Sequence, residues 1–132
     1  MEINYRNGFL PQPEQVVRLY ENAGLPRPTN DIQRIKKMYD NSNLVITAWD
    51  GDILVGVSRC ITDWAWSTYL ADLAVLREYS KLGIGKKLIE LTKKEAGEQS
   101  MLLLLSVPTA MDYYPKVGFT KQESSFIIHR EN

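Results

Sequence analysis

The hydrophobic pattern of the first half of the chain predicts a short strand followed by two helices. Residues 1–6 alternate between apolar and polar positions, as a strand does. Residues 14–23 carry apolar side chains at helical spacing, and Gly24 is expected to end that helix as its C-cap. A second amphipathic helix is expected to begin after a cap at Thr29 or Asn30.

The middle of the chain has the pattern of an antiparallel sheet. Residues 44–49 and 53–62 are two β-rich runs joined by Asp50-Gly51-Asp52, a sequence typical of a hairpin turn. A further strand is expected over residues 68–76. The front half of the domain is therefore predicted to be largely antiparallel.

The second half predicts helices alternating with strands. A helix is expected after Gly83-Ile84-Gly85, and the nearly all-apolar run 101–107 fits a strand covered on both faces. Pro108 is expected to start a short helix that Gly118 ends, and residues 119–130 to supply one or two last strands. The whole chain, 1–132, is interpreted as a single α/β domain.

Composition agrees with one globular domain and narrows the class of partner. The chain has 132 residues, 44% of them hydrophobic, with 16 basic and 16 acidic side chains. The balanced charge argues against a dedicated nucleic-acid binder. The single cysteine, Cys60, excludes an internal disulfide and a multi-cysteine metal site. With no apolar run near ~20 residues and no visible signal peptide, no membrane partner is expected and the default location is the cytoplasm.

The segment after the strand 68–76 carries the most chemical information. Two glycines, Gly83 and Gly85, open a helix, so main-chain amides at its N-terminus can face an anion. Glycine lets a phosphate approach those amides closely because there is no Cβ. Lys81 and Lys86 can add positive charge. The alternative is a tight turn between a strand and a helix with exposed lysines.

Spacing excludes two other nucleotide-binding patterns. A Walker A loop has the form G-x-x-x-x-G-K-[ST], whereas Ser80 stands at the first glycine position and Lys87 follows Gly85-Lys86. The dinucleotide fingerprint requires a third glycine, where this chain has Leu88.

Two motifs, Ser80-Lys81-Leu82-Gly83-Ile84-Gly85 and the segment from Ala110 to Phe119, together resemble the GNAT superfamily of acetyl-CoA-dependent N-acetyltransferases. Residues 80–85, Ser-Lys-Leu-Gly-Ile-Gly, are similar to the family's Arg/Gln-x-x-Gly-x-Gly/Ala loop, with serine in place of Arg/Gln. Residues 110–119 are similar to its Ala-x-x-Phe-Tyr-x-x-x-Gly-Phe signature. The resemblance implies an α/β GNAT fold with a mixed central sheet of six to seven strands and about four helices.

The resemblance also implies where acetyl-CoA binds. The pyrophosphate is expected on the loop amides, and the pantetheine arm is expected to pair with the main chain of Leu73 and Val75 like an added strand. Tyr113 is expected in the core or as a wall of the cofactor site. The residues implied for cofactor binding are Leu73, Val75, Lys81, Leu82, Gly83, Ile84, Gly85, Lys86 and Tyr113.

Tyr114 matches the family position that often protonates the departing CoA thiolate. A phenol, with a pKa of about 10, is protonated at neutral pH and can act as this acid. The glutamate of some histone-modifying members corresponds to Tyr69, so that base is absent. Asp63 and Asp72 are the nearby carboxylates, and a water chain with no dedicated base is the favoured interpretation.

The predicted function is transfer of acetyl from acetyl-CoA to a primary amine by direct attack, without a metal. The acceptor is open between amino acid, polyamine, antibiotic, peptide N-terminus and protein lysine. The chain is expected to use one open cleft or a homodimer partner to close it. The alternatives are a non-catalytic acyl-CoA sensor and an interaction domain on the same fold.

Overall fold

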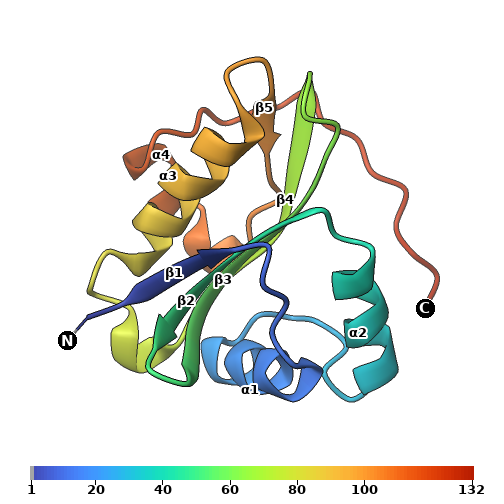
Figure 1. Cartoon of the computed structure of the whole chain (residues 1–132). Helices are drawn as coiled ribbons and strands as arrows, with labels where there is room; N and C mark the ends of the chain where they lie inside the picture. The colour runs from blue at the N-terminus through green and yellow to red at the C-terminus, as the bar shows by residue number, and fades with distance from the viewer. Residues whose placement is uncertain (1) are drawn as a thin grey trace.

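A five-stranded mixed sheet with helices on both faces forms the framework of the protein (Figure 1). The computed structural model describes residues 2–132. The strand order is β1-β2-β3-β4-β5, with β4 and β5 parallel and all other neighbours antiparallel. The strands are β1 (Asn4–Asn7), β2 (Leu44–Asp50), β3 (Ile53–Thr62), β4 (Ser67–Val75) and β5 (Met101–Leu103).

Helices α1 and α2 cover one face of the sheet, and α3 covers the other (Figure 1). The helices are α1 (Pro13–Ala23), α2 (Ile32–Asp40), α3 (Ile84–Ala96) and α4 (Tyr113–Lys116), with 3₁₀ turns at Arg77–Tyr79 and Pro108–Ala110. Because both faces of the sheet are covered, nearly every residue of β2 is buried. Strand β3 is likewise buried over most of its length.

Gly56 lets α3 lie close against β3. A Cβ at this position would stand 3.1 Å from both Ile84 Cγ2 and Leu88 Cδ1. Further along the same face, Ser58 and Thr92 share a buried hydrogen bond of 2.7 Å between their hydroxyl oxygens. These contacts fix the position of the α3 N-terminus relative to β3 and β4.

Most of the predicted front half is confirmed. The hairpin between β2 and β3 forms, and Gly24 ends α1 with a left-handed φ of 73°. The predicted N-cap of α2 was wrong. The side chain of Asp31, and not that of Thr29 or Asn30, accepts a hydrogen bond from the N–H of Arg34. Met1, part of the expected first strand, lies outside the described residues.

The predicted back half of the sheet requires two corrections. The strand expected over 101–107 pairs only at residues 101–103, and Leu103 and Leu105 are exposed, so the run is not covered on both faces. Residues 119–130 form no strand, which leaves five strands instead of six to seven. A strand needs a partner edge, and the apolar alternation in this segment could not reveal whether one was available.

Candidate active site

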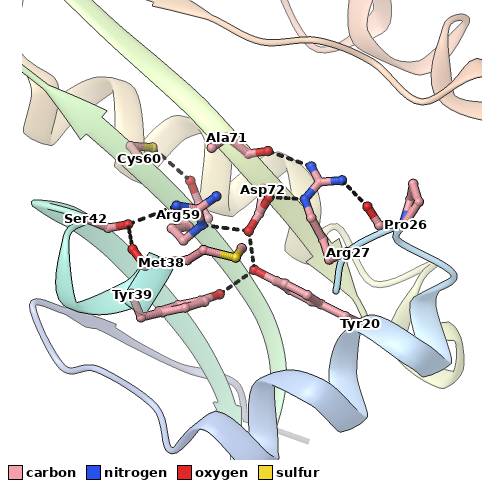
Figure 2. Close-up of polar contacts among 11 residues, drawn as sticks. Tyr20, Pro26, Arg27, Met38, Tyr39, Ser42, Arg59, Cys60, Ala71 and Asp72 are labelled. Carbon is pink, nitrogen blue, oxygen red and sulfur yellow. Dashed lines mark hydrogen bonds and ion pairs between the residues drawn. The ribbon is translucent and has the colours of Figure 1, made fainter. Parts of the chain in front are cut away.

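A buried carboxylate, Asp72 on β4, is the centre of the polar network between the sheet and the first two helices (Figure 2). Arg27 Nε donates to Asp72 Oδ1 at 2.5 Å, and Arg59 Nε donates to Oδ2 at 2.6 Å. Tyr20 donates its hydroxyl to Oδ2 at 2.6 Å, so Tyr39 is left to donate to Tyr20 Oη. Both oxygens of the Asp72 carboxylate therefore accept a hydrogen bond from a charged or hydroxyl donor.

This network fixes the charge states of its members. Burial alone would raise the pKa of Asp72, but the hydrogen bond and charge of Arg59, with the charge of Arg27, hold it below its usual value. Burial raises the pKa of both Tyr20 and Tyr39, which stay neutral. Asp72 is thus an ionised carboxylate held by two arginines and a tyrosine, and its lowered pKa makes it a poor general base.

A bulge in β4 opens the sheet next to Asp72. Arg59 pairs with Asp72 and Cys60 with Leu70, so Ala71 has no partner on β3. The carbonyl of Ala71 instead accepts Arg27 Nη2 at 2.8 Å. Because β4 and β5 pair only over three residues each before this point, the two strands separate beyond it.

A cavity of about 230 Å³ fills the space between the separated strands. Leu73 and Val75 of β4 line one side, and Leu104 and Val107 line the other. The main chain of Leu73 and Val75 pairs with β3 along one edge of β4. The opposite edge of β4 is unpaired at these residues, because its pairing with β5 ends at Tyr69. That free strand edge can accept an extended ligand through main-chain hydrogen bonds.

The glycine loop lies at the end of β4, where α3 begins. Gly83 is the N-cap of α3 with a left-handed φ of 76°, a conformation that strains other residues. The N–H groups of Ile84, Gly85 and Lys86 are the first of the helix and have no acceptor within it. Lys81 and Leu82 are exposed beside them, whereas the Ile84 side chain is buried in the core.

Tyr113 connects this loop to α4. A Cβ added to Gly85 would lie 2.9 Å from Tyr113 Oη and 3.9 Å from Val75 Cγ2. Glycine at this position therefore allows Tyr113 to lie against the first turn of α3. The structure brings the loop, the end of β4 and Tyr113 together.

Tyr114 lines the cavity between β4 and β5. Its ring packs edge-to-face against Tyr113 and Phe119, with centroids 5.3 and 5.5 Å apart. Burial, with a smaller contribution from Tyr113, raises its pKa above the usual phenol value. Tyr114 is therefore a neutral hydroxyl held by packing at the wall of the cavity.

A second, larger cavity of about 700 Å³ adjoins the first on the α2 side of the sheet. The two cavities share four lining residues: Arg27, Ala71, Leu105 and Val107. The charged side chains that line the second cavity are Arg27, Arg34, Arg59, Arg130 and Asp72. Since Asp72 is already paired with two of these arginines, the cavity is electropositive.

Asp63, the other carboxylate that the sequence singled out, has a local structural role. Its Oδ1 accepts the N–H groups of Ala65, Trp66 and Ser67 at 2.7–3.0 Å. These hydrogen bonds lower the pKa of Asp63. Trp66 itself is 74% exposed in this turn.

Cys60 is a buried thiol, as the sequence predicts. Burial raises its pKa to about 11, so the sulfur stays protonated and packs as a small apolar side chain. Within residues 2–132, no three His, Cys, Asp or Glu side chains converge in a group that could hold a metal ion. No helix in that range has the length and apolar character to cross a membrane.

The sequence did not reveal the partners of Asp72. Tyr20, Arg27 and Tyr39 lie 33 to 52 positions before it, in or beside the two helices predicted for the front half. The signal available was two tyrosines on the apolar faces of α1 and α2, where a buried hydroxyl needs a polar partner.

Comparisons with known proteins point to one family. A family model described as an acetyltransferase (GNAT) domain matches residues 14–129. An uncharacterised N-acetyltransferase of the ycf52-like type from Prochlorococcus marinus is 27% identical over 112 residues, 80% of this chain and 61% of the relative. The ycf52 protein of Pyropia yezoensis is 25% identical over 68% of this chain and 55% of its own length. The chain thus spans less than two thirds of the curated relatives it matches.

Solved structures share the fold. A protein of unknown function from methicillin-resistant Staphylococcus aureus, described as a probable acetyltransferase, has a TM-score of 0.86 at 24% identity, with 99% of this chain and 100% of that chain covered. An aminoglycoside acetyltransferase from an uncultured soil sample, solved with sisomicin, has a TM-score of 0.70 at 21% identity, with 97% and 95% covered. The aminoglycoside N-acetyltransferase AAC(6')-Iy, solved with CoA, has a TM-score of 0.74 at 12% identity, with 99% and 96% covered.

Replacing Asp72 by asparagine should destabilise the protein strongly. The change leaves Arg27 and Arg59 without their counter-charge in a buried site, and breaking such a pair costs about 3–5 kcal/mol in the free energy of unfolding. Urea denaturation measures this loss. The control is Asp40→Asn, which removes the exposed pair with Lys36 and should change stability by less than ~1 kcal/mol.

The same variant should alter the dependence of stability on pH. Since the pKa of Asp72 is lower in the folded than in the unfolded protein, its stabilisation is present above the unfolded value of about 3.9 and is lost as pH falls through the folded value. Asp72→Asn should therefore lose less stability than the wild type below pH ~4. Equal acid sensitivity of the two proteins would contradict this assignment.

Proposed function

The chain belongs to the GNAT family of acetyltransferases, and on that premise we propose that it transfers an acetyl group from acetyl-CoA to a primary amine. The observation that carries the proposal is the pair of adjoining cavities with a common wall. One lies along the free edge of β4 and contains Tyr114, and the other opens on the α2 side. This arrangement suits a ternary complex in which an amine meets a thioester at the junction.

Acetyl-CoA is proposed to lie along the first cavity. Its pyrophosphate would accept hydrogen bonds from the main-chain N–H groups of residues 83–86, aided by the charges of Lys81 and Lys86. Its pantetheine arm would pair with the free edge at Leu73 and Val75. Ser80 occupies the position where the family usually has Arg or Gln, so this side chain offers a weaker contact than the amides do.

The reaction follows from this placement. The amine nitrogen attacks the thioester carbonyl carbon, a C–N bond forms, and the C–S bond breaks. The departing sulfur takes the proton of the Tyr114 hydroxyl, which is neutral because burial raises its pKa, and the phenolate that remains is reprotonated from water. The proton lost by the amine passes to water in the open second cavity, since Asp63 and Asp72 are both occupied by structural hydrogen bonds.

Calorimetric titration with acetyl-CoA tests the proposal, with ATP and NADH as negative controls. We expect selective binding of acetyl-CoA and CoA in the wild type. Gly85→Val should abolish it, because the added side chain meets Tyr113 and covers the amides at the start of α3. The matched control is Glu95→Val, which places the same side chain at an exposed position near the other end of α3 and should leave binding unchanged.

Two negative results of these experiments would each favour one of the alternative functions. Absence of binding at millimolar acetyl-CoA would favour the interaction domain. Binding without release of thiol for any amine would favour the acyl-CoA sensor.

Tyr114→Phe should lower kcat about 100-fold or more while leaving the KM for acetyl-CoA nearly unchanged. The reason is that phenylalanine keeps the ring packing but cannot protonate the sulfur. Thiol release under saturating substrates measures the effect. Tyr113→Phe is the matched control and should change kcat only a few-fold; an unchanged kcat in Tyr114→Phe would exclude the acid role.

The electropositive second cavity should favour monoamines over polycations as acceptors. Four arginines line it, and its one carboxylate is already paired twice. We expect spermidine and sisomicin to give lower kcat/KM than aliphatic or aromatic monoamines of similar length. Rates measured at low and moderate salt check this, because screening should reduce the difference. A preference for polyamines that persists at low salt would contradict it.

A further inference from the structure

The cavity on the α2 side of the sheet carries more positive charge than the fold itself uses. Arg27, Arg34, Arg59 and Arg130 line it, and Asp72 is the one carboxylate among its lining residues. Four positive charges and one negative charge leave a net charge of +3 on this lining. A concave surface of one sign attracts ligands of the opposite sign.

Arg27 is already occupied by contacts within the protein. Its Nε donates to Asp72, its Nη1 to the carbonyl of Pro26 at 2.7 Å and its Nη2 to the carbonyl of Ala71 at 2.8 Å (Figure 2). All three nitrogens of this guanidinium thus donate to the chain. Arg27 contributes charge to the cavity, and the donors for a ligand must come from other residues.

Arg59 has one nitrogen that the protein leaves free. Its Nε donates to Asp72 at 2.6 Å and its Nη1 to Ser42 Oγ at 3.1 Å (Figure 2). Its Nη2 makes no hydrogen bond within residues 2–132, and no fully buried side-chain nitrogen or oxygen of that range lacks a partner. Nη2 therefore reaches open space, and the cavity that Arg59 lines is the open space beside it.

Arg34 brings a second free guanidinium from α2. Its side chain is exposed, and no ion pair joins it to a carboxylate in the described part of the chain. Its Nη2 donates to the main-chain oxygen of Asn132 at 3.0 Å, and Asn132 also lines the cavity. Arg34 therefore already holds an oxygen atom at the cavity. A planar guanidinium is the side chain best suited to bind the two oxygens of a carboxylate.

The uncharged part of the lining is largely apolar. Met38 is half-buried, Tyr69 is 39% exposed and Leu105 is 54% exposed, and all three line the cavity. Apolar atoms of a ligand can be buried against these side chains. A second positive charge on the ligand would find no free carboxylate among the lining residues.

We propose that the acceptor is an amino acid with an apolar side chain, whose carboxylate binds Arg34 and Arg59 and whose amino group lies toward the wall shared with the acetyl-CoA cavity. This inference rests on the proposed function and names its substrate class. The amino nitrogen forms the C–N bond, the C–S bond breaks, the amine proton passes to water, and the sulfur takes the proton of Tyr114. The products are CoA and the N-acetylamino acid.

The same arginines would favour the reactive form of the amine. Positive charges near an amine favour its neutral form over the ammonium and so lower its pKa. The lining keeps a net charge of +2 after one carboxylate has bound. Because Asp63 and Asp72 are both held by structural hydrogen bonds, this electrostatic effect would help to supply the neutral amine where the protein offers no dedicated base.

The test compares acceptors that differ only in the carboxylate. Leucine, leucinamide and 3-methylbutylamine share one side chain, but only leucine carries a negative charge. Thiol release at saturating acetyl-CoA should give a kcat/KM for leucine about 30-fold or more above that of either analogue, the effect expected of a charge-assisted hydrogen bond. O-phosphoethanolamine is the fourth acceptor, because a guanidinium also binds phosphate.

Arg34→Gln should remove most of this preference. The variant should lower kcat/KM for leucine about 30-fold and for leucinamide less than about three-fold, because only leucine loses a charge partner. Arg34 is exposed, so the variant should fold as the wild type does, which circular dichroism checks. The matched control is Arg18→Gln, an exposed arginine of α1 outside both cavities, which should leave all rates unchanged.

The outcomes separate this inference from the proposed function. Leucinamide or 3-methylbutylamine reacting as well as leucine would leave the transferase intact and overturn the amino-acid acceptor. A higher rate with O-phosphoethanolamine than with leucine would overturn it in favour of a phosphate-bearing amine. Equal rates with leucine in Arg34→Gln and Arg18→Gln would exclude Arg34 as the carboxylate partner.

A direct binding measurement covers the case in which no amine releases thiol. That result would contradict the proposed function, and calorimetric titration with leucine and leucinamide would then test the site alone. Tighter binding of leucine than of leucinamide, lost in Arg34→Gln, would support the carboxylate site. Equal binding of the two ligands in the wild type would overturn it.

Discussion

The ion pairs of Asp72 are the interaction on which the arrangement of this protein depends. One carboxylate on β4 accepts from Arg59 on the neighbouring strand, from Arg27 in the loop after α1, and from Tyr20 on α1, which in turn bonds to Tyr39 on α2. A buried charge is tolerated only when it is paired and hydrogen-bonded. The requirement to satisfy Asp72 therefore fixes where both front helices lie against the sheet.

The same network opens the sheet where the reaction is proposed to occur. Arg27 binds Asp72 with Nε and the carbonyl of Ala71 with Nη2, so the main chain of the bulge points to a guanidinium and not to a neighbouring strand. β5 cannot continue its pairing past this point, and the gap becomes the cavity between β4 and β5. Arg27 thus both stabilises the buried carboxylate and lines the cavity proposed to bind acetyl-CoA.

Features that depend on residues close together in the sequence could be predicted, whereas contacts between distant residues could not. The turn at Gly51, the cap at Gly24 and the loop at Gly83 and Gly85 are local, and each needs only its own few residues. The Asp72 network joins residues up to 52 positions apart, so no single stretch of sequence could reveal it. Residues 119–130 have the apolar alternation of a strand, but alternation does not show which edge a segment pairs with, and in the described structure they form no strand.

Arg27 has two roles, in lining both cavities and in pairing with Asp72, and this restricts which substitutions the cavities can accept. Arg27 lines both cavities and neutralises Asp72, so replacing it to suit a different acceptor would leave a buried carboxylate with one partner fewer. Arg34 and Tyr69 line the second cavity without contacting Asp72, and both are exposed. If the second cavity holds the acceptor, as proposed, its specificity can change at α2 and at Tyr69 with little effect on stability, whereas changes at Arg27 in the shared wall would destabilise the fold.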